Sequence, residues 1–220
     1  FVLKKSREFF RLSAGAFDVT TAPLVDLWGF TNRKFYLPSE QEIQQALKLV
    51  GSDKIILRND DNVVKFSLPD LKIDLGAIAK GYALDCAANK LKERGIENCL
   101  INAGGQVLCV GTNYGKPWRV AVKDPGSNKV IRILQLKNQS VSTSGDSEQY
   151  FIQGNKRYGH IFNPKTGYPV SSKLSSVTVV APDGLTADAL STSVIVLGKQ
   201  KGLELVNKFP GAKVYIVQQR

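Results

Sequence analysis

The residues best suited to chemistry lie where a run of small side chains opens a predicted helix. The segment 73–85 reads IDLGAIAKGYALD and places Lys80 among glycines and alanines. Small residues let the backbone approach a ligand, and free N–H groups at a helix start bind anionic oxygens. The lysine adds a mobile positive charge. These features predict a site for a phosphate-bearing ligand, although such residues also open helices for packing reasons alone.

A second set of oxygen ligands lies on a predicted helix near the C-terminus. Asp188 and Thr192 are four residues apart, which places their side chains on one helix face. A carboxylate and a hydroxyl suit Mg²⁺, a hard cation that often shares phosphate oxygens with its protein ligands. The alternative is structural, with Asp188 stabilising the helix dipole and Thr192 bonding back to a carbonyl of its own helix.

His160 is the only histidine, and it lies between a predicted strand end and the turn-rich segment 163–167. Loops held on a scaffold often carry binding groups, and an imidazole accepts a proton near neutral pH. His160 is therefore a candidate general base. The segment 142–148, STSGDSE, is either a polar hairpin loop or a ligand contact. Asp18 likewise is either a turn residue or a ligand contact.

The composition limits the class of protein. With 220 residues, 43% of them hydrophobic, the chain can bury a core as one domain over 1–220 or as two intimate lobes. No apolar run reaches the roughly 20 residues of a membrane-spanning helix. The net charge of +11, from 30 basic and 19 acidic residues, favours anionic partners such as nucleotides, nucleic acid or an acidic membrane face. Basic runs never exceed two residues, and we expect no aromatic residues interleaved with them, so no nucleic-acid partner is predicted. A nucleic-acid binder is kept as an alternative that rests on the net charge alone.

Cys86, Cys99 and Cys109 are not spaced as a metal site or a disulfide framework. Each falls in a predicted helix or strand, so we expect all three to be buried as small hydrophobic residues. The chain lacks methionine and opens directly into a predicted helix. We interpret this as processing or truncation that would have removed any targeting segment.

Hydrophobic periodicity and turn residues predict an α+β fold with largely antiparallel sheets packed with helices. The lysine-bearing segment is predicted as a strand end, a glycine turn and a helix that stops at Gly95. Helices are predicted over 1–14, 23–28, 39–51, 76–95, 187–197 and 199–208, with Ser39 as N-cap and Glu42 completing a capping box. Strands are predicted over 55–57, 63–66, 98–102, 106–110, 118–122, 130–136, 140–144, 150–153, 176–180 and 212–217.

Taken together, these segments resemble the ApbE family, the FAD:protein FMN transferases. The resemblance runs in family order over nearly the whole chain. The matching segments are 15–18 (GAFD), 23–30 (PLVDLWGF), 74–83 (DLGAIAKGYA), 102–105 (NAGG), 142–146 (STSGD), 159–167 (GHIFNPKTG) and 187–192 (ADALST). Each motif is moderately specific, whereas the ordered set is not expected by chance.

The resemblance implies a fold related to the T-fold, an FAD site, and a divalent metal, usually Mg²⁺, on the pyrophosphate. Carried over by position, the Ala77 carbonyl and the side chains of Asp188 and Thr192 would hold the metal. The residues along FAD would be Asp18, Lys80, Glu148, His160 and Ile161. The candidate catalytic residues are His160 and Asp188, either of which could act as the base.

The family transfers FMN from FAD to a threonine or serine hydroxyl of an acceptor protein and releases AMP. The resemblance therefore predicts a Mg²⁺-dependent FMN transferase. The alternatives are a Mg²⁺-dependent FAD pyrophosphatase and a non-catalytic flavin-binding protein. The acceptor would be a subunit of a membrane redox complex, and the protein a periplasmic or membrane-anchored bacterial lipoprotein. The family's N-terminal segment, which helps hold the flavin nucleotide, is missing here, so we expect this chain alone to bind FAD poorly.

Overall fold

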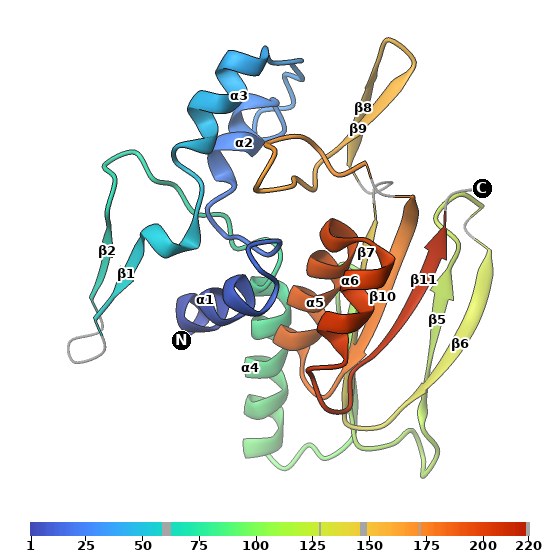
Figure 1. The fold of residues 1–220 in the computed structure, drawn as a ribbon. Helices are drawn as coiled ribbons and strands as arrows, with labels where there is room; N and C mark the ends of the chain where they lie inside the picture. The colour runs from blue at the N-terminus through green and yellow to red at the C-terminus, as the bar shows by residue number, and fades with distance from the viewer. Residues whose placement is uncertain (59–62, 128, 146–148, 172, 219–220) are drawn as a thin grey trace. The chain divides into compact units, whose positions relative to one another are not determined.

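A computed structural model describes residues 1–58, 63–127, 129–145, 149–171 and 173–218. The chain divides into two compact units, which are described separately (Figure 1). Unit 1 comprises Phe1–Leu75 and Glu148–Ser171, and unit 2 comprises Gly76–Ser147 and Ser172–Arg220. A single domain over 1–220 stays a prediction.

Unit 1 combines short helices with two antiparallel hairpins. Its helices are α1 (Val2–Leu12), α2 (Ala22–Leu27), α3 (Glu40–Leu47) and the 3₁₀ turn η1 (Ser52–Lys54). Its hairpins are β1 (Ile55–Leu57) with β2 (Val64–Phe66), and β8 (Tyr150–Gln153) with β9 (Lys156–Gly159). The sequence predicted these elements except η1 and β9.

The start of α3 confirms the capping box. The Ser39 side chain accepts from the backbone N–H of Glu42, and the Glu42 carboxylate accepts from the backbone N–H of Ser39. The helix ends at Leu47, however, so the predicted end at Gly51 was wrong. Gly51 instead has φ 138°, and its N–H donates to the Thr20 hydroxyl at 2.6 Å. This bond ties the segment after α3 to a residue 31 positions earlier in the chain.

Trp28 is the centre of the aromatic core of unit 1 and is fully buried. The rings of Tyr158 and Phe162 lie 5.4 and 6.1 Å from its own. Its indole N–H donates to the carbonyl of Gly167 at 3.0 Å. At Gly167 φ is 74°, and a Cβ would lie 2.5 Å from a side-chain carbon of Ile43. This packing fixes the loop that follows His160 onto α2 and α3.

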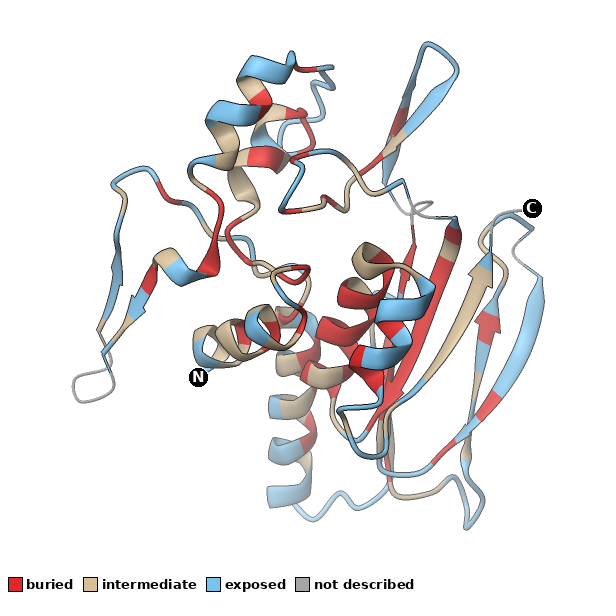
Figure 2. Ribbon diagram, viewed as in Figure 1, coloured by how far each residue is buried: buried red, intermediate tan, exposed pale blue. Residues whose placement is uncertain are grey.

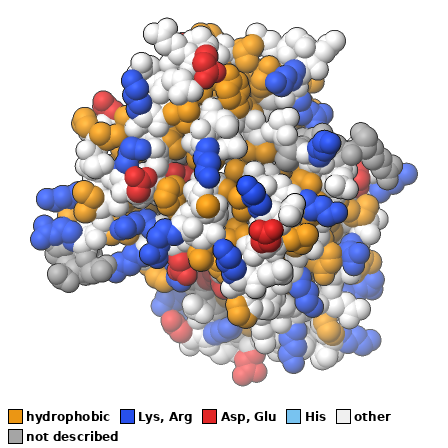
Figure 3. All heavy atoms as spheres, viewed as in Figure 1, with side chains coloured by type: hydrophobic (Ala, Val, Ile, Leu, Met, Phe, Trp, Pro, Cys, Tyr) orange, Lys and Arg blue, Asp and Glu red, His pale blue; other side chains and the backbone are white. Residues whose placement is uncertain are grey.

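The β8–β9 hairpin brings two basic side chains onto aromatic rings. The Arg157 guanidinium lies 4.2 Å from the centre of the Tyr150 ring, and the Lys156 ammonium 5.3 Å from that of Tyr158. Arg157 and Tyr150 meet across the two strands, whereas Lys156 and Tyr158 lie two residues apart on one face of β9. Elsewhere, Lys and Arg side chains are scattered among hydrophobic and neutral ones on the face in Figure 3.

Unit 2 is built on a five-stranded sheet in the order β11-β10-β7-β4-β3, with every neighbouring pair antiparallel. A separate hairpin pairs β5 with β6. The strands are β3 (Cys99–Ala103), β4 (Gln106–Val110), β5 (Trp118–Lys123), β6 (Val130–Leu136), β7 (Gln139–Gly145), β10 (Leu174–Ala181) and β11 (Lys213–Gln218). The helices are α4 (Ala79–Glu93), α5 (Gly184–Leu197) and α6 (Lys199–Val206). These elements confirm the predicted α+β fold.

Each face of this sheet has a different partner (Figure 1). On one face α5 packs against β7 and β10, while α4 packs against α5, β3 and β4. On the other face the β5–β6 hairpin buries side chains against β4, β7 and β10. Because strand residues alternate between faces, Val141 of β7 faces the hairpin, and Ser140, Ser142 and Ser144 face the helices. The helix α5, which packs against the sheet, α4 and α6, is buried along most of its length (Figure 2).

Two expectations were wrong, one about the strand before Gly76 and one about the burial of the cysteines. The predicted strand end directly before Gly76 is absent, since residues 71–75 are irregular. Cys86 is exposed and Cys99 only partly buried, whereas Cys109 is buried as predicted. The buried face of α4 consists of Gly81, Leu84 and Ala88. Glycine gives no hydrophobic signal in the sequence, so the pattern pointed to the wrong face.

In the described parts of the chain, no helix is both long and apolar enough to cross a bilayer.

Candidate functional site

Two glycines bring α4 and α5 into direct backbone contact. A Cβ on Gly81 would lie 2.1 Å from the carbonyl oxygen of Gly184, and one on Gly184 would lie 2.5 Å from that of Gly81. Any larger residue at either position would force the helices apart. Because Asp188 lies one turn after Gly184, this contact places its carboxylate beside the first turn of α4.

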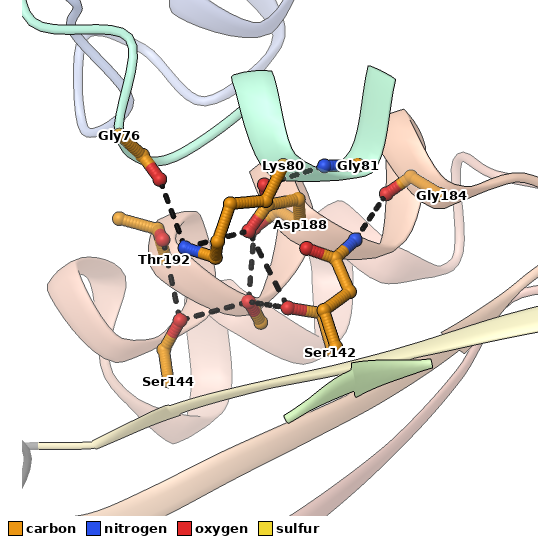
Figure 4. Close-up of polar contacts among 10 residues, drawn as sticks. Gly76, Lys80, Gly81, Ser142, Ser144, Gly184, Asp188 and Thr192 are labelled. Carbon is orange, nitrogen blue, oxygen red and sulfur yellow. Dashed lines mark hydrogen bonds and ion pairs between the residues drawn. The ribbon is translucent and has the colours of Figure 1, made fainter. Parts of the chain in front are cut away.

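The Asp188 carboxylate is the centre of the site and is only 3% exposed (Figure 4). Its Oδ2 accepts from the backbone N–H of Gly81 at 3.0 Å. Its Oδ1 accepts from the Ser142 hydroxyl at 3.4 Å and lies 4.0 Å from the Lys80 ammonium. A buried carboxylate is costly unless it is paired and hydrogen-bonded. Here it has an N–H, a hydroxyl and a cation around it.

A row of hydroxyls joins Asp188 to Thr192 across the contact between β7 and α5. The Ser144 Oγ lies 2.8 Å from that of Ser191 and 3.2 Å from Thr192 Oγ1. The Ser191 hydroxyl donates to the Asp188 carbonyl at 2.9 Å. Thr192 is a residue that the sequence predicted for the site, whereas Ser191 was not predicted. Ser142 and Ser144 belong both to the predicted strand 140–144 and to the segment 142–148, a possible hairpin loop; the structure places both in β7. Their spacing of two residues along a strand was the available signal.

Lys80 is in the first turn of α4, and its side chain reaches back over the turn that precedes the helix. Its ammonium donates to the carbonyl of Gly76 at 3.1 Å and faces Asp188 from the same position. Its side chain is 51% exposed, so the charged end can move. Ala77 lies in the turn between Gly76 and α4. The structure therefore confirms that the lysine-bearing segment and the Asp188–Thr192 helical turn lie together, as the phosphate-and-cation hypothesis requires.

The donors gathered here suit a hard divalent cation. They are a carboxylate, hydroxyls and main-chain carbonyls, with no thiol or imidazole among them. Among the described residues there is no group of three or more His, Cys, Asp or Glu that could hold a metal. A cation at Asp188 would therefore depend on a single carboxylate and take further oxygens from its ligand, as Mg²⁺ does with phosphates.

His160 lies in unit 1, directly after β9. Its backbone N–H donates to the carbonyl of Gln149 at 3.1 Å, and its ring Nδ1 lies 3.2 Å from the same oxygen. A carbonyl only accepts, so Nδ1 carries a proton, and in the neutral imidazole the lone pair is then on Nε2. This tautomer suits a general base. Ile161 follows, half-buried, and its carbonyl accepts from Val170 N–H at 2.8 Å. Glu148 lies outside the described residues.

Asp18, also in unit 1, organises the loop that contains it. Its Oδ1 accepts from the Thr20 N–H and hydroxyl, at 2.8 and 2.6 Å, and from the Ser52 hydroxyl at 2.7 Å. Its Oδ2 accepts from the Ser52 N–H at 3.2 Å. These bonds match the structural interpretation of Asp18. The residue also lines a cavity of about 530 Å³ with Arg11 and Lys165, and a flavin contact there stays a prediction.

The family model described as the ApbE family matches residues 1–216. The FAD:protein FMN transferase of Haemophilus influenzae is 38% identical over 215 residues, which cover 94% of this chain and 62% of that protein. The FAD:protein FMN transferase of Vibrio cholerae is 35% identical over 216 residues, covering 95% and 64% respectively. The chain thus spans about three fifths of the length of the curated relatives it matches.

Solved structures agree with the sequence comparison. The ApbE protein of Thermotoga maritima superposes with a TM-score of 0.91 at 40% identity, covering 98% of this chain and 71% of the other. The flavin transferase ApbE of Vibrio cholerae superposes with a TM-score of 0.88 at 32% identity, covering 100% and 70%. The described fold is therefore that of these proteins.

Proposed function

The chain belongs to the ApbE family, and on that premise we propose that the protein transfers the FMN part of FAD to a serine or threonine hydroxyl of an acceptor protein, releasing AMP. Relatives at 35–38% identity bear the name FAD:protein FMN transferase. The observation that carries the proposal is the junction of α4 and α5. There the buried Asp188 carboxylate meets the Gly81 N–H and the mobile Lys80 ammonium.

We propose that the Asp188 and Thr192 side chains and the Ala77 carbonyl would hold Mg²⁺. The all-oxygen donor set around Asp188 supports this assignment. When bound, the cation would offset negative charge on the pyrophosphate. The chain's own contribution is to hold Asp188 through the Gly81 N–H and to supply Lys80, whose ammonium would move from the Gly76 carbonyl to a phosphate oxygen.

His160 is the proposed general base, since its Nε2 keeps a lone pair while Nδ1 is held at the Gln149 carbonyl. It would take the proton of the acceptor hydroxyl as that oxygen bonds to the phosphorus of the FMN part. The bond from this phosphorus to the bridging oxygen breaks, and AMP leaves with that oxygen. Such transfers need alignment and charge neutralisation more than covalent help. Asp188 is the alternative base. Asp18, Glu148 and Ile161 are proposed to lie along FAD.

The test uses the full-length protein with FAD, Mg²⁺ and a candidate acceptor. Mass spectrometry detects FMN added to the acceptor, and chromatography measures AMP. We expect Asp188→Ala to abolish AMP release. We expect Thr192→Ser to resemble wild type, and Thr192→Val to lose roughly tenfold or more because it removes the hydroxyl. Wild-type turnover by Asp188→Ala would refute the metal assignment.

An arm without acceptor separates the alternatives. A strict transferase should release little AMP there, whereas a pyrophosphatase would release AMP at its full rate by using water. A non-catalytic flavin-binding protein would bind flavin and release no AMP at any Mg²⁺ concentration. The family resemblance also supports a periplasmic or membrane-anchored lipoprotein in a bacterium, with its acceptor in a membrane redox complex. Cell fractionation and acceptor mass spectrometry test these two proposals.

A further inference from the structure

Both backbone groups of Gly184, the first residue of α5, are held by side chains from other elements. Its N–H donates to Asp85 Oδ1 at 2.6 Å, and the next N–H, of Leu185, donates to Asp85 Oδ2 at 2.9 Å. Its carbonyl accepts from Gln106 Nε2 at 2.9 Å. Asp85 lies on α4 and Gln106 begins β4. Three elements are thus tied together at one residue.

These bonds are more than an ordinary helix cap, because α5 already has one. The Asp183 side chain accepts from the Thr186 N–H at 2.7 Å and from the Thr186 hydroxyl at 2.9 Å. A local cap satisfies part of the free N–H groups at a helix start. Asp85 binds two more of these groups from a different helix. It therefore fixes where α5 begins relative to α4.

The contact between α4 and α5 is reciprocal, and the sequence repeats this arrangement. Gly81 and Asp85 form one Gly-x-x-x-Asp segment on α4, and Gly184 and Asp188 form another on α5. The two glycines pack against each other. Each aspartate accepts from the backbone N–H of the other helix's glycine, Asp85 at 2.6 Å and Asp188 at 3.0 Å. A four-residue spacing places each glycine and its aspartate on one helix face.

The two halves of this reciprocal pair differ in their surroundings. Asp188 also meets Lys80 and the Ser142 hydroxyl. Asp85 uses both oxygens on backbone N–H groups, and its pKa is raised, mainly by burial. A carboxylate with both oxygens occupied in this way serves to hold a position rather than to bind a ligand. A shift of α5 along α4 would carry Asp188 away from the Gly81 N–H, which it now accepts from at 3.0 Å.

We propose that Asp85 is a positioning residue for the cation site, setting the place of α5 on α4 so that Asp188 stays beneath the Gly81 N–H and oriented to bind a divalent cation. The cation itself rests on the proposed function, whereas the positioning of Asp188 by Asp85 does not. Gln106 assists by holding the Gly184 carbonyl. The repeat of Gly-x-x-x-Asp is the sequence signal for this role.

The test compares Asp85→Asn with Asp183→Asn in the full-length protein. The Asp85→Asn change keeps the shape of the side chain but turns an amide N–H₂ toward a backbone N–H, which breaks one of the two bonds. Asp183→Asn removes the same charge at the same helix start, yet asparagine caps a helix as well as aspartate does. We expect Asp85→Asn to weaken Mn²⁺ binding, measured by electron paramagnetic resonance without FAD, roughly tenfold or more. Asp183→Asn should bind Mn²⁺ like wild type.

A second measurement needs no metal. Gly81 is in the first turn of α4, where helices provide no partner for the N–H, so its protection from hydrogen exchange reports the Asp188 bond. We expect this protection to fall in Asp85→Asn and to persist in Asp183→Asn. If Asp85→Asn does not fold, Asp85→Glu keeps both acceptor oxygens on a longer stem and should show the same changes at smaller amplitude.

The outcomes separate the two proposals. Wild-type Mn²⁺ affinity and Gly81 protection in the Asp85 variants would overturn the positioning role while leaving the transferase proposal intact. Equal losses in Asp85→Asn and Asp183→Asn would also overturn it, since loss of charge would then explain both. A wild-type protein that binds no Mn²⁺ and releases no AMP would refute the proposed function, and Gly81 exchange would still decide the role of Asp85.

Discussion

Replacing Gly81 by alanine tests whether the close contact of α4 and α5 builds the site. On helix propensity alone, this change would stabilise the protein by about 1 kcal/mol. The close contact between Gly81 and Gly184 opposes this gain in stability. The new Cβ would lie 2.1 and 2.4 Å from the carbonyl oxygen and carbon of Gly184, and 2.7 Å from the Leu185 nitrogen. All three are backbone atoms, which cannot move aside as the end of a flexible side chain can.

The size of the effect follows from these distances. Ordinary contact begins at 3.4 Å, so the closest pair must open by about 1.3 Å from 2.1 Å, and the helices must separate. Overpacking of this kind costs about 1–3 kcal/mol. The separation also lengthens the bonds from Gly81 N–H to Asp188 and from Gly184 N–H to Asp85. Hydrogen bonds to charged groups contribute about 1.5–3 kcal/mol each. We therefore expect a net loss of about 3 kcal/mol or more, which exceeds the gain in propensity.

The assay is urea unfolding followed by circular dichroism, together with Mn²⁺ binding. Ala83→Gly, at an exposed position of the same helix, calibrates the propensity effect and should destabilise by about 1 kcal/mol. Gly81→Ala should lose stability and Mn²⁺ affinity together. If the variant is as stable as wild type or more so, the helices tolerate a methyl group at their crossing, and the argument from close contact is wrong.

Three further predictions concern single side chains. Lys80→Met removes an ammonium 4.0 Å from Asp188 Oδ1 and should strengthen Mn²⁺ binding by about 1 kcal/mol after solvent screening, while slowing AMP release; weaker Mn²⁺ binding would contradict competition between the two cations. Ellman's reagent should label Cys86 rapidly, and Cys109 only on unfolding, because burial raises the pKa of the Cys109 thiol to about 11; rapid native labelling of Cys109 would argue against its burial. Hydrogen bonds from Lys72 and, to a smaller extent, from Thr31 lower the pKa of Asp26 below its ordinary value of 3.8. The ionised carboxylate therefore contributes stability above pH 3.8, and this contribution is lost as the pH falls through the lowered pKa. Asp26→Asn should therefore cost up to about 1 kcal/mol at neutral pH and nothing in strong acid, as urea titrations at the two pH values would reveal; an equal cost at both would exclude the charge as the cause.

Local sequence patterns determined most of the secondary structure. The helices, most strands and the Ser39–Glu42 capping box could be predicted because periodicity, caps and turn residues act over a few neighbouring positions. The same reasoning placed Asp188 and Thr192 on one helix face and recognised Lys80 at a helix start. It failed for Cys86, because the buried face of α4 is set by Gly81, which carries no hydrophobic signal.

Only the tertiary structure decided which of these residues meet. Gly81 and Asp188 are 107 positions apart, and no local pattern indicates that their backbone and side chain bond. The hydroxyls of β7 lie against α5 because that helix packs on the sheet, and Asp85 contacts Gly184 because α4 packs against α5. The sequence by itself determined the chemistry available in each segment, since side-chain type and periodicity are local properties. The site arose from the backbone contact of two glycines, which depends on close packing between segments distant in the chain.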